Sequence, residues 1–371
     1  MIRTSLMREM LFGVDAGGVE RASGGGGSVR PTRVNNASHR NGSAGASPSQ
    51  LCGSGGGLCC SLAFVWLLTF VPTLAAQESS QFQAERAFGY LKSVCEIGPR
   101  ISGQPGMFKQ QEALKKHFED LDAKVAFQRF NVKDPLGNGR VNLANLIVRW
   151  HPDREKRILL CCHYDTRPFP DSDRTSPRGR FIGANDGGSG VALLAELGHH
   201  VGTLEGDYGV DFVFFDGEEF VYDRRRDTMF LGSTWFARQY ADNKFDVRYK
   251  FGILVDMIGD KDLQIYYEGN SLGYARRLTR SIWGVAKDLG VREFVPKKRH
   301  QIKDDHLPLN SIAKIETCDI IDFDFPNPQL GNVYWHTQQD VVENCSADSL
   351  EKVGRVVLEW LRRLQQGGGA K

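Results

Sequence analysis

The chain lacks a large net charge of either sign. Its 47 lysines and arginines are balanced by 45 aspartates and glutamates, which leaves a formal charge of +2. Binding to nucleic acid relies on an excess of basic residues, usually gathered on one face. The composition therefore makes no electrostatic case for a nucleic-acid partner.

CxxC spacing is also absent from the body of the chain, which argues against a structural zinc ribbon. Five of the eight cysteines follow residue 76. Because five is odd, at least one of them has no partner within the chain. Cys161 and Cys162 stand together in an apolar run, so we expect them to be small buried side chains rather than metal ligands.

Residues 1–57 have few of the apolar side chains that build a core. Glycine, serine and asparagine dominate them, with scattered arginines. Such a segment buries too little apolar surface to offset the entropy lost on ordering. We predict that it is a disordered Gly/Ser-rich tail.

The chain then becomes almost wholly apolar from Leu58 to Leu74, before Ala75, Ala76 and a polar stretch. A basic region, an apolar run and small residues follow one another in this order in secretory signal peptides. A membrane anchor is the alternative, although the run is shorter than the roughly 20 residues of an ordinary span. Either interpretation of residues 58–76 predicts that residues 77–371 are exported as one catalytic domain, secreted, periplasmic or tethered to a membrane. The oligomeric state is left open.

Hydrophobic periodicity after residue 80 predicts an α/β fold. Strands are expected at 124–131, 143–150, 157–162, 210–215 and 251–256, and helices at 82–95, 107–121, 188–200, 233–241, 272–289 and 348–364. Apolar strands that alternate with helices indicate a mostly parallel, twisted central sheet with helices on both faces. In such sheets the ligand site lies beyond the carboxyl ends of the strands.

Polar side chains collect at those strand ends. The residues concerned are His163 and Asp165 after one strand, Asp216, Glu218 and Glu219 after the next, Asp256 after a third, Asp186 at a helix start, and Asp304, Asp305, His306, Trp335 and His336 in later loops. Adjacent carboxylates such as Glu218 and Glu219 repel each other unless a positive charge holds them. Each residue alone has an ordinary interpretation: a solvated turn for the glutamates, a helix cap for Asp186. Together they favour a catalytic zinc site, because zinc accepts mixed histidine and carboxylate ligands.

The order of the motifs HxD, ND, DGEE, VDMIG, DDH and WHT resembles the zinc aminopeptidase superfamily called the M28 peptidases. Within that superfamily, residues 80–365 most resemble the glutaminyl-peptide cyclotransferases, or glutaminyl cyclases. These enzymes convert the N-terminal glutamine of peptides and proteins to pyroglutamate and release ammonia. The resemblance implies an aminopeptidase-like fold and one bound zinc.

The same resemblance implies a role for eight residues. The implied zinc ligands are Asp186, Glu219 and His336; Glu218 matches the residue that carries the proton; Asp256 and Asp304 match two aspartates of a hydrogen-bond network; and Trp335 and Phe325 match pocket aromatics.

Two features favour a cyclase over an aminopeptidase. Residues 220–231 intervene before Gly232 and Ser233, as the longer insert of the cyclases does, and KDDH has the doubled aspartate of the cyclases. The GANDGGSG segment, in contrast, is closer to the aminopeptidase pattern.

An M28-type aminopeptidase therefore remains the alternative, with a second zinc at His163 and Asp256. An inactive binding domain is a third interpretation, which the retention of both glutamates and every ligand disfavours.

Overall fold

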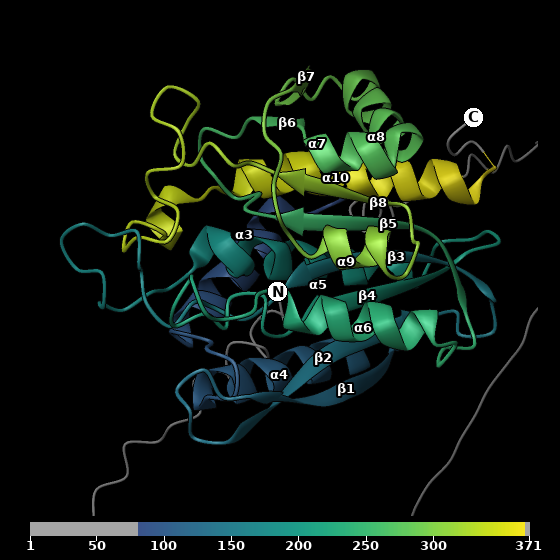
Figure 1. The fold of residues 1–371 in the computed structure, drawn as a ribbon. Helices are drawn as coiled ribbons and strands as arrows, with labels where there is room; N and C mark the ends of the chain where they lie inside the picture. The colour runs from purple at the N-terminus through teal and green to yellow at the C-terminus, as the bar shows by residue number, and fades with distance from the viewer. Residues whose placement is uncertain (1–80, 368–371) are drawn as a thin grey trace, which may run out of the picture. The chain divides into compact units, whose positions relative to one another are not determined.

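A six-stranded mixed sheet forms the centre of the fold in the computed structural model, which describes residues 81–367 (Figure 1). Its strands are ordered β1-β2-β4-β3-β5-β8. Their bounds are β1 Lys124–Lys133, β2 Arg140–Trp150, β3 Lys156–His163, β4 Gly209–Phe215, β5 Arg248–Asp256 and β8 Thr317–Ile321. The β1–β2 and β2–β4 pairs are antiparallel, whereas β4, β3, β5 and β8 run parallel to one another.

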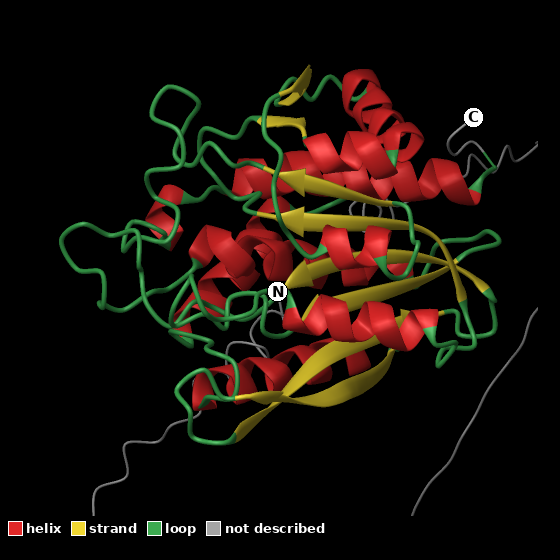
Figure 2. Ribbon diagram, viewed as in Figure 1, coloured by secondary structure: helices red, strands yellow, loops and turns green. Residues whose placement is uncertain are grey.

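Helices cover the sheet (Figure 2). They are α3 Ala84–Glu96, α4 Pro105–Glu119, α5 Gly190–Val201, α6 Leu231–Ala241, α7 Gly269–Tyr274, α8 Arg276–Asp288, α9 His306–Ser311 and α10 Ala347–Gln365. A kinked turn, η1 (Ala184–Ser189), precedes α5, a short helical turn, η2 (Val342–Asn344), precedes α10, and β6 (Ile265–Tyr267) pairs with β7 (Phe294–Lys298) beside the main sheet.

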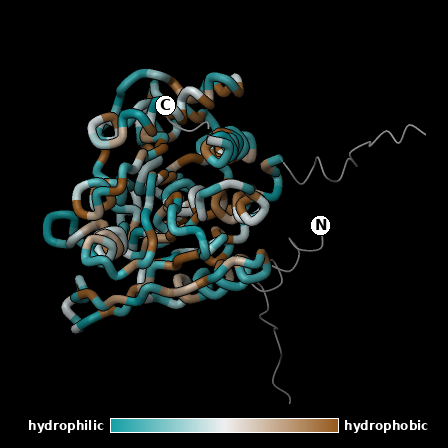
Figure 3. The backbone as a smooth tube through the Cα atoms, turned by 90° about the vertical axis from the view of Figure 1, so that its right-hand side faces the viewer, coloured by the Kyte–Doolittle hydropathy of each residue, from teal (hydrophilic) through white to brown (hydrophobic). Residues whose placement is uncertain are grey.

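Alternation along the strands decides which helices cover which face, because neighbouring strand residues point to opposite faces. In β3, Leu160 and Cys162 pack in a large core with α3, α4, α5, α8 and α10. Leu159 and Cys161 point to the other face, where a smaller core includes residues of α6 and α9. Both cysteines are buried, as predicted, and neither forms a disulfide. Figure 3 shows that hydrophilic segments lie largely in the outer loops.

The predicted mostly parallel sheet with helices on both faces is confirmed, although several details differ. The short elements β6, β7 and α9 were not predicted. The edge strand β8 was not predicted, because it is five residues long and carries the polar Thr317 and Asp319. The helix expected at 272–289 is interrupted at Ala275, whose ψ of 41° leaves helical geometry, so α7 and α8 are separate. The β1–β2 hairpin adds an antiparallel edge.

The parallel strands end at one edge of the sheet, and this positions the site. His163, the last residue of β3, is paired in register with Phe215, the last residue of β4, and Asp256 ends the neighbouring β5. Within residues 81–367 no helix has both the length and the apolar character of a membrane span. The segments 1–57 and 58–76 lie outside the described residues.

Candidate active site and metal centre

The kinked turn before α5 places Asp186. Its ψ of 104° departs from helical geometry, and Gly187 adopts a φ of 79°. A Cβ at Gly187 would lie 2.8 Å from the Asp165 carbonyl oxygen and 2.9 Å from the His163 ring, so the turn requires glycine. Asp340 holds the turn by accepting the backbone N–H groups of Asn185, at 2.6 Å, and Asp186, at 3.1 Å. The Asp186 side chain does not cap α5 and is left for other contacts.

The Glu218–Glu219 turn is held by Asp165 beneath it. One Asp165 carboxylate oxygen accepts the N–H of Glu218 at 3.2 Å, and the other accepts the N–H of Glu219 at 2.9 Å. The two glutamates are only 6% and 2% exposed. The solvated-turn interpretation is therefore wrong, and the pair is buried at the end of β4.

Asp186, Glu219 and His336 converge on one point. The Nε2 atom of His336 lies 3.1 Å from Glu219 Oε1 and 3.3 Å from Asp186 Oδ2. All three side chains are buried, and one ligand atom from each lies within 4.8 Å of the others. Asp186 Oδ2 and Glu219 Oε2 have no hydrogen-bond partner among the described residues. Two unpaired buried carboxylate oxygens beside an imidazole nitrogen fit a divalent cation such as zinc.

A second group of candidate ligands shares Asp186. The Nε2 atom of His163 lies 3.2 Å from Asp186 Oδ1 and 3.3 Å from Asp256 Oδ1. Asp186 thus presents one oxygen to each group, as a carboxylate that bridges two ions does. The donor set is compatible with one ion or with two.

Burial and neighbouring charges separate the two glutamates chemically. Burial raises the pKa of Glu218 well above its usual range, and the Glu219 carboxylate raises it further. Although burial opposes the change, His336 and Arg167 lower the pKa of Glu219. Paired carboxyl groups whose pKa values are driven apart are typical of sites in which one carries a proton and the other stays charged.

Asp256 and Asp304 are both buried near this pair. Burial raises the pKa of each carboxyl group, and the charge of Asp256 contributes to the rise at Asp304. Asp304 Oδ1 accepts the Asp305 N–H at 2.5 Å, whereas its Oδ2 has no partner within residues 81–367. The two carboxyl groups therefore titrate as interacting sites.

Trp335 and Phe323, here called the aromatic wall, lie beside the candidate ligand His336. Trp335 stacks on His336 with ring centroids 3.7 Å apart, and Phe323 meets Trp335 edge to face at 5.3 Å. Trp335 and Phe323 are partly exposed, whereas Phe325 is fully buried against Tyr334. Sequence reasoning missed Phe323, whose only signal is its position two residues before Phe325.

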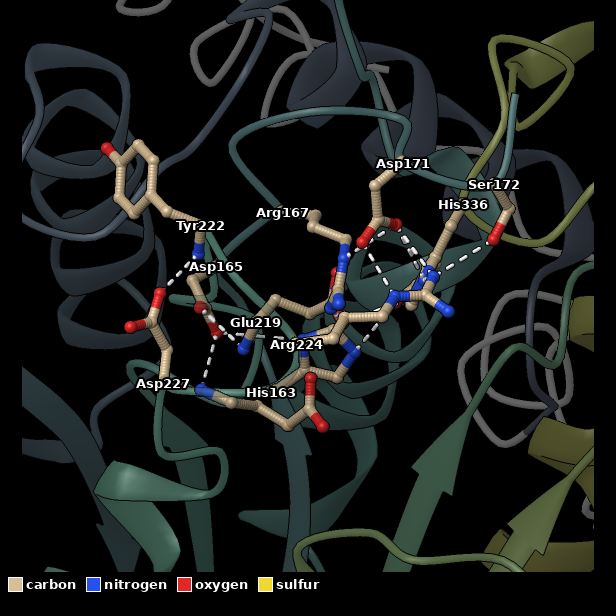
Figure 4. Close-up of polar contacts among 12 residues, drawn as sticks. His163, Asp165, Arg167, Asp171, Ser172, Glu219, Tyr222, Arg224, Asp227 and His336 are labelled. Carbon is tan, nitrogen blue, oxygen red and sulfur yellow. Dashed lines mark hydrogen bonds and ion pairs between the residues drawn. The ribbon is translucent and has the colours of Figure 1, made fainter. Parts of the chain in front are cut away.

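Three charged residues that were not predicted from the sequence lie around the candidate ligands (Figure 4). They are Arg167, Asp171 and Arg224. The buried Arg167 donates to Glu219 Oε1 at 2.5 Å and to Asp171 at 3.0 Å. Arg224 donates to both oxygens of Asp171, at 2.6 and 2.7 Å, and its Nη2 lies 2.7 Å from His336 Nδ1. The one sequence signal for these residues is that Arg167 follows closely after the HxD motif at His163–Asp165.

A third buried group, Glu268, His306 and Asp319, also brings one candidate ligand atom from each residue within 4.8 Å of the others. His306 faces Glu268 through Nε2, at 3.4 Å, and Asp319 through Nδ1, at 3.5 Å. The Glu268 carboxylate is, however, occupied by four donors around the start of α7.

Comparison with known proteins gives the family of the chain. The family model for peptidase family M28 matches residues 145–361. The solved glutaminyl cyclase of Fimbriiglobus ruber is 39% identical, with a TM-score of 0.71, and the match covers 76% of this chain and 95% of that one. A leucine aminopeptidase precursor from Bacteroides thetaiotaomicron is 31% identical, with a TM-score of 0.69 and coverage of 76% and 97%.

A glutaminyl-peptide cyclotransferase of Bothrops jararaca is 25% identical over 298 residues, which are 71% of this chain and 77% of that protein. The M28 match spans more than half of the chain, and the aligned structures share its fold. The chain therefore belongs to peptidase family M28.

Proposed function

We propose that this protein is a zinc-dependent glutaminyl-peptide cyclotransferase, which converts the N-terminal glutamine of peptides and proteins to pyroglutamate and releases ammonia. The observation that carries the proposal is the convergence of the buried Asp186, Glu219 and His336 side chains, with the buried Glu218 adjacent to Glu219. The similarity to the glutaminyl cyclase of Fimbriiglobus ruber supports the choice of reaction.

The metal would be held by Asp186, Glu219 and His336, because one candidate ligand atom from each lies within 4.8 Å of the others and each carboxylate has one oxygen without a hydrogen-bond partner among the described residues. When bound, zinc supplies a Lewis acid for the amide oxygen of the substrate's glutamine side chain. Arg167 neutralises the Glu219 oxygen that it contacts and leaves the other oxygen for the metal.

Glu218 would move the proton. In the reaction the α-amine nitrogen forms a bond to the side-chain amide carbon, and the bond from that carbon to the amide nitrogen breaks. The attacking amine loses a proton, and the departing nitrogen gains one as it leaves as ammonia. A carboxylate with a raised pKa accepts a proton more readily than an ordinary one, so Glu218 suits both transfers.

Asp256 and Asp304 would orient the attacking amine and share a proton, since both have raised pKa values. Trp335 would provide the apolar wall that holds the glutamine side chain bent and keeps water away. Phe325 would support Trp335 indirectly, because it packs against Tyr334, the residue that precedes Trp335.

An aminopeptidase is the second candidate, and the shared oxygens of Asp186 favour it. In that enzyme Glu218 would activate a water molecule, and His163 and Asp256 would hold a second metal that anchors the peptide amine. The alternative also has a relative in the leucine aminopeptidase precursor.

One experiment separates the two. Residues 77–371 are incubated with a Gln-initiated peptide and, separately, with a Leu-initiated peptide. Pyroglutamate and ammonia from the first peptide support the cyclase. Free leucine from the second, without cyclisation of the first, would overturn it.

We also propose that residues 77–371 are the exported catalytic domain, preceded by a signal peptide or anchor at 58–76 and a tail at 1–57. The order of residues in the apolar run supports this division. Mass spectrometry of the mature N-terminus would test it, with cleavage near Ala76 expected for a signal and an uncleaved chain for an anchor.

A further inference from the structure

Residues 220–231, here called the insert, connect the Glu218–Glu219 turn to α6. The turn at its centre is held by hydrogen bonds among its own residues. The Asp227 carboxylate accepts the N–H groups of Tyr222, at 2.9 Å, and Asp223, at 2.8 Å. The backbone N–H of Asp227 also donates to the Asp223 carbonyl at 2.9 Å. Arg224 therefore projects from a defined turn.

The Arg224 guanidinium bridges groups from two segments that are far apart in the sequence (Figure 4). Its Nε and Nη2 atoms donate to the two oxygens of Asp171, at 2.6 and 2.7 Å. Its Nη2 also lies 2.9 Å from Ser172 Oγ and 2.7 Å from His336 Nδ1. Its central carbon lies 5.1 Å from the ring centroid of Trp335. One side chain thus contacts both a candidate metal ligand and the aromatic wall.

Asp171 completes the arrangement. Its Oδ1 lies 3.5 Å from His336 Nδ1 and 3.0 Å from Arg167 Nε, and Arg167 in turn contacts Glu219. A carboxylate beside the outer nitrogen of a metal-binding histidine fixes the orientation of the ring. Asp171 and the two arginines thereby join His336 to Glu219 outside the metal centre.

We propose that Arg224 is a positioning residue that holds His336 and Trp335 in one mutual orientation, so that the insert couples the metal ligand to the substrate wall. The turnover part of this inference rests on the proposed cyclase function. A guanidinium group suits the role because its planar donors hold both oxygens of Asp171 and contact Ser172 while its face lies over an aromatic ring. When Nε2 of His336 binds a metal, its Nδ1 carries the proton, so Arg224 acts on the ring through the Asp171 carboxylate, which lies 3.5 Å from Nδ1. A lysine ammonium group has neither the planar shape nor the paired N–H donors of a guanidinium group.

The test compares Arg224→Ala with Arg225→Ala. Arg225 is the adjacent exposed arginine, and within residues 81–367 no hydrogen bond or ion pair joins its side chain to another group. Zinc affinity is measured by competition with a chelator, and KM and kcat are measured with a Gln-initiated peptide. Arg224→Ala is expected to weaken zinc binding about 10- to 100-fold, the usual effect of removing a partner of a metal ligand, and to raise KM. Arg225→Ala should match the unmodified protein in both.

Two further measurements test whether the role depends on the guanidinium group itself. Free guanidinium ion at low millimolar concentration should restore part of both properties to Arg224→Ala, and Arg224→Lys should restore neither. If Arg224→Ala does not fold, Arg224→Lys takes its place in the comparison with Arg225→Ala. A change in zinc affinity without a change in KM, or the reverse, overturns the inference, as does equality with Arg225→Ala. Zinc affinity can be measured without turnover. If the unmodified protein does not cyclise the peptide, that result therefore counts against the proposed function and not against the role of Arg224 in zinc binding.

Discussion

The Asp165 carboxylate accepts the backbone N–H of Glu219 at 2.9 Å, and so ties the end of β3 to the turn that follows β4. Its other oxygen accepts the N–H of Glu218. The direction of both glutamate side chains therefore depends on one buried carboxylate that does not belong to the candidate ligand set.

Replacing Asp165 with asparagine should disturb this turn. An amide offers one acceptor oxygen where the carboxylate offers two, so one backbone N–H loses its partner, at a cost of about 1–3 kcal/mol. We expect a lower free energy of unfolding by urea and a fall in kcat. Unchanged kcat in a folded Asp165→Asn variant would show that the turn is held by other contacts.

Glu218→Gln should abolish turnover and keep the metal. The amide cannot accept the proton from the attacking amine, and positioned proton transfer contributes about 10²–10⁴-fold to rate. Because Glu219, Asp186 and His336 are untouched, bound zinc should match the unmodified protein in metal analysis. Activity that survives the substitution would remove Glu218 from the proton-carrying role, and loss of zinc would move it into the ligand set.

His163→Ala tests the number of metal ions. A cyclase with one zinc at Asp186, Glu219 and His336 should bind one equivalent both before and after the substitution. His300→Ala is a suitable control, because its Nε2 atom contacts Asp324, which is outside both ligand groups. Two equivalents that fall to one in His163→Ala would establish the second site and favour the aminopeptidase.

Phe323 and Phe325 form a matched pair with different expected effects. Phe323 is partly exposed beside Trp335, so Phe323→Ala should raise KM for a Gln-initiated peptide and alter stability little. Phe325 is fully buried, so Phe325→Ala should lower the free energy of unfolding by about 3–5 kcal/mol. Kinetics and urea unfolding of both variants check this. The opposite pattern would give Phe325 the direct role at the substrate.

Asp322 should make stability depend on pH. Burial raises the pKa of its carboxyl group to about 8, whereas the unfolded chain releases this proton near pH 4. The folded protein binds the proton more tightly, so the contribution of Asp322 is fully present below about pH 4 and is lost as pH rises to about 8.

Asp322→Asn should therefore show a smaller decline in the free energy of unfolding between pH 5 and pH 8 than the unmodified protein. The exposed Asp262 provides the control, and Asp262→Asn should keep the full decline. If the decline is the same in Asp322→Asn, other buried acids account for it.

Much of the fold could be predicted because strands and helices alternate with clear periodicity. The predicted strands ending near residues 162, 215 and 256 correspond to β3, β4 and β5. The parts that escaped prediction have weak local patterns. The strand β8 is short and carries Asp319. The helix breaks at residue 275, which is alanine rather than proline or glycine.

The sequence by itself determined that His163, Glu219 and Asp256 would lie near one another, since each stands at or just after the end of an apolar strand and parallel strands end at one edge. Only the tertiary structure decided what surrounds them. Arg224 and His336 are 112 positions apart, and Arg167 and Glu219 are 52 apart, so no local periodicity records their contacts. Burial likewise separated Phe323 from Phe325 and turned the adjacent glutamates into chemically different groups, because desolvation and charge depend on neighbours that folding brings together.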